Sequence, residues 1–302
     1  MAGKVSGMPV PPIRELEAIC GGEGRDPGAP RDFRNLYAVL IRKLSIRITW
    51  LLLHTRMSAN TVTIIGILVG VAGALMLACN RFWVLVGGLV LLQLSFVIDF
   101  SDGEVARYRA QAEHTPTNAG GAYLDWIGHY YVPAIAIAAV AWGAYTQSGH
   151  GWLMLAALIA VLSVVRVAYS ARDHVLLGLY RDRPELRGSP EFLRAVLARQ
   201  GGDPERLDLA ADYRGRRAGA PGSTLLWRRW TGLGQLLVFP GFVNLLTFFV
   251  AIDLLLSGLD GEYPVLQHVA GREVLIALLG VVHLVHQLRA AAQGFQVMRR
   301  LP

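Results

Sequence analysis

The sequence predicts an all-α integral membrane protein with six transmembrane helices, preceded by an N-terminal amphipathic helix that lies in the membrane interface. Of its 302 residues, 53% are hydrophobic and only 17% are charged, which is too apolar for an ordinary soluble domain. Several apolar runs reach the ~20 residues that a helix needs to cross a bilayer. Its basic residues, nearly all arginine, gather beside these runs, as expected for residues that set topology and contact anionic headgroups.

The net charge of +7 could also indicate a nucleic-acid partner. Arginines next to apolar segments fit lipid headgroups better than they fit the basic surface of a nucleic-acid-binding protein. We therefore expect membrane lipids, and no nucleic acid, among the partners. The two cysteines, Cys20 and Cys79, are far apart and show neither metal-binding nor redox spacing.

The N-terminal part of the chain is predicted to lie outside the bilayer core. Residues 1–31 are rich in Gly and Pro with mixed charge, which predicts a flexible cytoplasmic tail, and they lack the apolar core of a signal peptide. Residues 32–56 interleave leucines with Arg42, Lys43 and Arg47. Because the fully apolar part of this segment is too short to span, we expect an interfacial helix with its arginines among lipid phosphates.

The membrane domain is predicted over residues 57–302. Ser58 or Asn60 can cap the first span. The six spans are expected at about 58–79, 82–107, 120–145, 152–171, 233–256 and 274–289. The one sizeable insertion is a loop at 176–229, whose arginines are expected to contact anionic lipid or, alternatively, a phosphate-bearing substrate.

The charges of the connecting loops predict the orientation. The links after the first, third and fifth spans carry little positive charge, whereas the N-terminal helix, the 176–229 loop and the Arg299-Arg300 tail are rich in arginine. The positive-inside rule then places both termini in the cytoplasm. The expected location is a bacterial plasma membrane, with the candidate site described next at its cytoplasmic face.

The chemistry of the chain concentrates in two short segments. Asp99 and Asp102 lie three residues apart on one helix face, and Asp125 and His129 lie four apart on the next helix. Ionisable groups at the edge of apolar runs are a functional-site hypothesis, because placing them there is unfavourable. A solvated turn beside the membrane would explain scattered charges but not this helical spacing. Carboxylate oxygens suit Mg²⁺ or Mn²⁺, ions that usually hold substrate phosphates.

Small and basic residues surround these carboxylates. Gly103 and Ala106 leave a thin helix face where a ligand or a second helix can approach. Arg107 offers a planar guanidinium suited to a phosphate group. Gly121 would let the second and third spans come close together.

These positions resemble the signature of the CDP-alcohol phosphotransferase family: Asp99, Asp102, Gly103, Ala106, Arg107, Gly121 and Asp125 match it one by one. The start of the first span is similar to the family's Pro-Asn-x-x-Thr motif through Asn60 and Thr63, with Ala59 in place of proline. The resemblance covers roughly residues 35–290. It implies six spans, an interfacial helix and usually a homodimer.

The resemblance also implies a reaction. An alcohol would attack the β-phosphorus of a CDP-linked donor and release CMP, with one or two Mg²⁺ or Mn²⁺ ions as cofactors. The implied metal ligands are Asp99, Asp102 and Asp125, and the implied nucleotide-binding residues are Asn60, Thr63, Gly103, Ala106, Arg107 and Gly121.

Two features depart from the family pattern. The 13 residues between Arg107 and Gly121 form a longer linker than usual, which is tolerable because added loop length costs little. The fourth motif aspartate, the family's general base, is His129 here. Since a neutral imidazole can accept a proton from a hydroxyl near neutral pH, we expect His129 to be the base. The alternative is a catalytically degenerate member that serves as a nucleotide- or lipid-binding membrane scaffold.

The substrates are less tightly predicted. The run that includes Glu104 and Gln111 resembles family members that use inositol phosphate or related polyol phosphates, which favours CDP-diacylglycerol as donor in phospholipid biosynthesis. A soluble CDP-alcohol donor with a lipid acceptor is the alternative. The candidate acceptor-binding residues are Arg166, Arg172, His283 and His286. The two histidines share a helix face and could instead form interhelical hydrogen bonds. A transporter is disfavoured because the carboxylates cluster at one membrane face.

Overall fold

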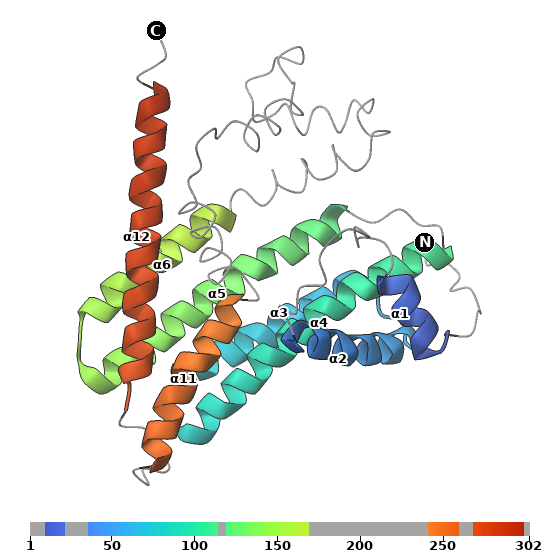
Figure 1. The fold of residues 1–302 in the computed structure, drawn as a ribbon, viewed down its shortest axis with the longest axis horizontal. Helices are drawn as coiled ribbons and strands as arrows, with labels where there is room; N and C mark the ends of the chain where they lie inside the picture. The colour runs from blue at the N-terminus through green and yellow to red at the C-terminus, as the bar shows by residue number, and fades with distance from the viewer. Residues whose placement is uncertain (1–9, 22–35, 114–118, 169–240, 260–267, 299–302) are drawn as a thin grey trace.

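The regular secondary structure in the part of the chain that the structure describes consists of helices (Figure 1). This computed structural model describes residues 10–21, 36–113, 119–168, 241–259 and 268–298. Within these ranges there are eight helices and no strand, which confirms the all-α prediction there. The helices are α1 (Ile13–Gly21), α2 (Leu36–Leu53), α3 (Ala59–Met76), α4 (Phe82–Glu113), α5 (Ala119–Ser148), α6 (Trp152–Ala168), α11 (Gly241–Leu259) and α12 (Ala270–Met298).

Four of these helices are long and apolar enough to cross a membrane. The candidate spans are Ala59–Met76, Phe82–Gln111, Gly120–Ser148 and Phe242–Leu259, and a shorter apolar stretch covers Trp152–Val165. These helices support the prediction that the chain is a membrane protein. The count of six spans, the orientation and the interfacial position of α2 stay predictions. The predicted loop at 176–229 lies outside the described residues.

Helix α3 packs against both α4 and α5, so it forms the middle of the site-bearing part of the molecule. A Cβ at Gly73 would lie 2.8 Å from the carbonyl oxygen of Gly88, so the backbones of α3 and α4 meet more closely than any larger residue permits. Nearer the carboxylates, the Ser95 hydroxyl on α4 donates to the carbonyl of Gly66 on α3 at 2.7 Å. These contacts fix α4 relative to α3.

The ends of α3 and α4 bear on two features of the sequence, the predicted helix cap and the long linker before Gly121. Ser58 caps α3, because its hydroxyl accepts a hydrogen bond from the Thr61 amide at 3.1 Å. Helix α4 continues past Arg107 to Glu113, beyond the predicted end of the second span. Part of the long linker before Gly121 is therefore helix, in keeping with its run of helix-favouring Arg, Ala, Gln and Glu.

A short helix, α1, lies inside the 1–31 segment that the sequence predicted to be a flexible tail. Its nine residues are too few to form a stable helix alone, so packing must hold it. Leu16 is fully buried, and the Cys20 thiol donates to the carbonyl of Glu104 on α4 at 3.6 Å. In Figure 1, α1 stands beside α2 and the C-terminal end of α4.

A buried polar cluster ties the helices together at the other end of α4. Arg272 on α12 and Asp253 on α11 are both fully buried and form an ion pair with an Nε–Oδ2 distance of 2.8 Å. Arg272 also donates to the side-chain oxygen of Asn80 at 2.7 Å, and Asn80 donates to the carbonyl of Gly143 on α5 at 2.9 Å. Since α4 starts at Phe82, this cluster is roughly 25 Å along the helix from Asp99.

Candidate metal and substrate site

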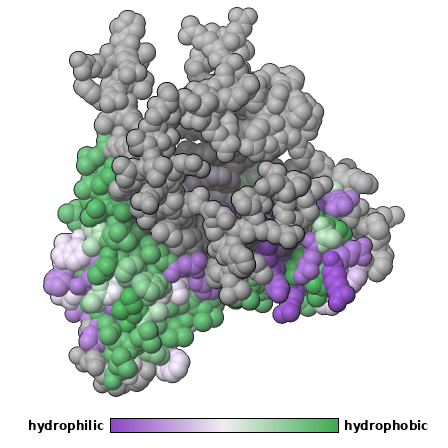
Figure 2. Space-filling model, viewed as in Figure 1, coloured by the Kyte–Doolittle hydropathy of each residue, from purple (hydrophilic) through white to green (hydrophobic). Residues whose placement is uncertain are grey.

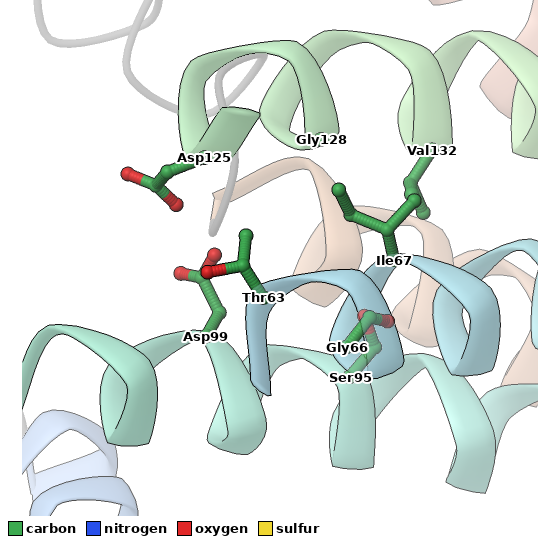
Figure 3. Close-up of a pocket in the computed structure, with 8 residues that line it drawn as sticks. All are labelled: Thr63, Gly66, Ile67, Ser95, Asp99, Asp125, Gly128 and Val132. Atoms are coloured by element: carbon green, nitrogen blue, oxygen red, sulfur yellow. The ribbon is translucent and has the colours of Figure 1, made fainter. Parts of the chain in front are cut away.

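Three of the four predicted site residues converge between α4 and α5. Figure 3 shows Asp99 of α4 and Asp125 of α5 pointing toward each other beside Thr63 of α3. One ligand atom from each of Asp99, Asp125 and His129 lies within 4.8 Å of the others. Their side chains are only 24%, 34% and 25% exposed, respectively, so the group is largely withdrawn from solvent.

The imidazole of His129 lies between carboxylates from two helices. Its Nε2 is 3.2 Å from Oδ2 of Asp99, and its Nδ1 is 3.6 Å from Oδ1 of Asp125, one helical turn earlier on α5. A neutral imidazole has one donor and one acceptor nitrogen, whereas an imidazolium has two donors. Because both nitrogens face carboxylate oxygens, a neutral ring turns its one lone pair toward a carboxylate, and a cation held beside the ring would compensate this contact.

Asp102 is the fourth of the predicted site residues. It lies outside the 4.8 Å group, although it lines the same wide cavity as Asp99 and Asp125. It is only 6% exposed, and within the described residues its Oδ2 is buried without a hydrogen-bond partner. A buried carboxylate oxygen is unfavourable unless a ligand or cation pairs with it.

The residues present fit a divalent cation. Carboxylate oxygens and an imidazole are ligands that Mn²⁺ accepts, and Mg²⁺ accepts the carboxylates. The unpartnered oxygen of Asp102, on the wall of the same cavity, is a further donor of the right kind. The structure therefore supports a candidate metal site, with Asp99, Asp125 and His129 as its most compact donor set.

Two hollows meet at these carboxylates. The inner one is narrow and ends at Gly128 and the apolar side chains of Ile67 and Val132 (Figure 3). The outer one is an open cavity of about 720 Å³, within the range of small-molecule sites. Its lining residues come from four helices: Glu17, Ala18 and Cys20 of α1, Arg42, Lys43 and Ile46 of α2, Asp99, Phe100, Asp102, Gly103, Glu104 and Arg107 of α4, and Asp125 of α5.

The two signature glycines contact different groups from those predicted. A Cβ at Gly103 would lie 3.2 Å from Nη1 of Arg107, so this glycine makes room for the arginine of its own helix. The prediction that Gly121 lets the second and third spans approach is wrong. A Cβ there would lie 2.5 Å from Oδ1 of Asn60, so Gly121 brings α5 against α3 instead.

Three of the six candidate nucleotide-binding residues line one of the two hollows. Thr63 lines the inner hollow, and Gly103 and Arg107 line the outer cavity. Asn60 and Gly121 lie next to each other at the start of α3 and α5. Ala106 lines neither of these hollows.

Of the four candidate acceptor-binding side chains, the structure describes only that of His283. His283 is on α12 and does not line either hollow. Arg172 and the side chains of Arg166 and His286 lie outside the described residues. One polar contact between α6 and α12 is present, because the Gln287 amide donates to the Ser163 hydroxyl at 2.6 Å. This contact is of the interhelical kind that was the alternative for the histidines.

Sequence reasoning missed the contribution of α1 and α2 to the outer cavity. Arg42 and Lys43 were assigned to lipid phosphates, yet both line this cavity. No pattern in the sequence pointed to α1. A usable signal for α2 was Ser45 and Thr49, one turn apart, whose hydroxyls donate to Glu104 at 3.0 and 2.7 Å.

A comparison of the chain with protein-family models found no matching model, and a comparison with curated proteins found no match. The function proposed below therefore rests on the residues of this chain and on the signature they resemble.

Proposed function

We propose that this protein is a metal-dependent CDP-alcohol phosphotransferase, which moves a substituted phosphate group from a CDP-linked donor to an alcohol and releases CMP. The observation that supports this most strongly is the convergence of Asp99, Asp125 and His129 from two helices, within 4.8 Å, with both carboxylates on the wall of a cavity of about 720 Å³. The signature resemblance supports the class of reaction.

In this proposal, the donor diphosphate would bind to a metal ion held by the carboxylates and to the guanidinium of Arg107. Asp99 and Asp125 would hold a Mg²⁺ or Mn²⁺ ion, with Asp102 as a further oxygen donor. When bound, the ion supplies charge stabilisation for the phosphate oxygens during transfer. Arg107, whose guanidinium lies over Gly103 on the cavity wall, binds another diphosphate oxygen.

His129 receives the proton. The acceptor hydroxyl oxygen forms a bond to the β-phosphorus of the donor, and the bond from that phosphorus to the bridging oxygen of CMP breaks. CMP leaves with the electron pair, and the hydroxyl proton passes to the imidazole. One ring nitrogen takes the proton, while the carboxylate at the other nitrogen orients the ring and stabilises the imidazolium; Asp99 lies 3.2 Å from Nε2 and Asp125 lies 3.6 Å from Nδ1.

The proposed donor is CDP-diacylglycerol, and the proposed acceptor is a soluble alcohol such as a polyol phosphate. A lipid donor reaches the site from the membrane, whereas the acceptor enters the open cavity from the aqueous side. The setting is phospholipid biosynthesis by a homodimer in a plasma membrane, with the site facing the cytoplasm.

A screen of donors and acceptors tests the function. The purified protein, with Mg²⁺ or Mn²⁺, is given CDP-diacylglycerol and, in turn, serine, glycerol phosphate, inositol or inositol phosphate, and CMP is measured. Soluble CDP-alcohols with diacylglycerol form a second arm. We expect metal-dependent CMP release with one acceptor. Binding of CDP without CMP from any pair would contradict the enzyme and indicate the scaffold.

A further inference from the structure

Helix α1 has a fixed place on the molecule although it is short. Leu16 is fully buried under it, and the Cys20 thiol contacts the Glu104 carbonyl at 3.6 Å. The two anchors are four residues apart, on one face of the helix. Glu17 and Ala18, elsewhere on the helix surface, are exposed, and they line the outer cavity together with Cys20.

Helix α2 is fixed by buried polar contacts to α4. Both carboxylate oxygens of Glu104 accept hydrogen bonds from α2, one from Ser45 and one from Thr49. The Ser101 hydroxyl of α4 donates back to the carbonyl of Ser45 at 3.2 Å. All four residues are less than a tenth exposed, so these contacts hold α2 firmly against α4.

One turn before Ser45, two cations of α2 reach the cavity. Arg42 and Lys43 are exposed and line it. Within the described residues, no ion pair of 4 Å or less engages either side chain, although the charge of Arg42 also acts on the buried Glu104 carboxylate. Figure 2 shows hydrophilic side chains gathered on the side of the molecule where α1 and α2 lie in Figure 1.

The cavity therefore has two chemically different walls. Carboxylates from α4 and α5 line one wall together with Arg107, whereas α2 contributes two cations and α1 contributes Glu17. Paired cations bind a phosphate, and a carboxylate accepts hydrogen bonds from hydroxyls. A soluble molecule that carries both a phosphate and hydroxyl groups therefore fits the wall formed by α1 and α2.

We propose that α1 and α2 form a subsite for a soluble polyol phosphate, with Arg42 and Lys43 on its phosphate and α1 as the outer wall that covers it. The role of this ligand as the acceptor rests on the proposed function, whereas the binding of the ligand to the subsite is independent of that function. The same cations could meet a phosphate of a lipid headgroup, and the experiment separates these two sources.

The test follows the accessibility of α1 in the full chain. In a background carrying Cys20→Ser and Cys79→Ser, two variants are compared: Ala18→Cys, on the cavity wall, and Glu15→Cys, which is exposed on the same helix but does not line the cavity. The maleimide labelling rate of each is measured in detergent with glycerol 3-phosphate, inositol 1-phosphate, or the unphosphorylated polyols, and in nanodiscs containing anionic lipid.

We expect a polyol phosphate to slow labelling of Ala18→Cys at least threefold, while Glu15→Cys and the unphosphorylated polyols show no such effect. When Arg42→Ala and Lys43→Ala are added to the Ala18→Cys variant, the polyol phosphate should no longer slow its labelling. Equal rates with and without the polyol phosphates would overturn the proposal, and so would protection by anionic lipid alone. If the protein shows this protection but releases no CMP, the subsite is supported and the proposed reaction is contradicted. Failure of the subsite and failure of the proposed function are therefore distinguishable.

Discussion

The Nε2 atom of His129 on α5 lies 3.2 Å from Oδ2 of Asp99 on α4, which joins two helices that both pack on α3. Few backbone contacts link α4 to α5 directly, so side chains span the space between them at the site. The glycines that set the distance of each helix from α3 therefore also set the separation of the reacting groups.

His129→Asn tests the role of the imidazole. If the ring is the base, this change should lower kcat by about 10²–10⁴-fold, because general-base catalysis contributes that much. Binding of Mn²⁺ alone, followed by electron paramagnetic resonance, should stay within about threefold of the wild type. Loss of Mn²⁺ binding would instead make His129 a metal ligand, as its place in the donor set allows.

Asp102→Asn should abolish turnover without lowering stability. The carboxylate is 6% exposed and one of its oxygens lacks a partner in the described structure, so a neutral amide removes an unfavourable buried charge. The melting temperature in detergent should be equal to or higher than that of the wild type. A clearly lower melting temperature would show that Asp102 has a structural role.

Asp253→Ala should be strongly destabilising, by about 3–5 kcal/mol, because it leaves the fully buried guanidinium of Arg272 without its carboxylate. The matched control is Glu273→Gln, which replaces the carboxylate that lies 2.8 Å from Nδ1 of the half-exposed His150 and should change stability by less than about 1 kcal/mol. Denaturant unfolding of both variants measures the difference. Similar values would mean that the Arg272 cluster does not hold this end of the bundle.

Gly73→Ala should separate α3 from α4. The added methyl would lie 2.8 Å from the Gly88 carbonyl oxygen, a backbone atom that cannot move aside, so we expect about 1–3 kcal/mol of destabilisation. Gly151→Ala is the control, since nothing lies within 4 Å of its Cβ position. Thermal unfolding compares the two. An unchanged melting temperature for Gly73→Ala would contradict the close packing.

Cys20 should react slowly with thiol reagents and respond steeply to pH. Burial and the nearby Glu104 carboxylate raise the pKa of its thiol to about 11, against an opposing effect of Arg107. A raised pKa keeps the group as thiol, so only about one thousandth is the reactive thiolate at pH 8. Iodoacetamide labelling of a Cys79→Ser variant should rise about tenfold per pH unit up to pH 11. A rate at pH 7.5 equal to that of the exposed Cys79 in Cys20→Ser would contradict the burial.

Helix periodicity was sufficient to predict local parts of the site. Residues four apart share a helix face whatever surrounds them, so the pairing of Asp125 with His129 followed from the sequence. The capping of α3 by Ser58 is local in the same way. Asp102 has helical spacing from Asp99, as the same rule requires. Which carboxylates converge, however, depends on how α4 and α5 are placed relative to each other, and spacing along one helix does not contain that information.

Tertiary contacts explain what the sequence did not reveal. Helix α1 depends on the burial of Leu16 beneath it, and nothing in a Gly- and Pro-rich segment signals that contact. The partner of Gly121 is Asn60 of α3 rather than a residue of α4, which depends on how three helices are ordered in space. Arg42 and Lys43 are basic residues of the kind that contact lipid phosphates, and only the packing of α2 on α4 brings them to the cavity.

The release of CMP from CDP-diacylglycerol tests the central claim most directly. The wild type, the wild type with EDTA, and Asp125→Asn are compared in the same liposomes with the acceptor that the screen identifies. We expect CMP from the wild type only in the presence of Mg²⁺ or Mn²⁺, and at least a hundredfold less from Asp125→Asn. CMP release by Asp125→Asn at the wild-type rate, or none from the wild type with any acceptor, would contradict the proposed site.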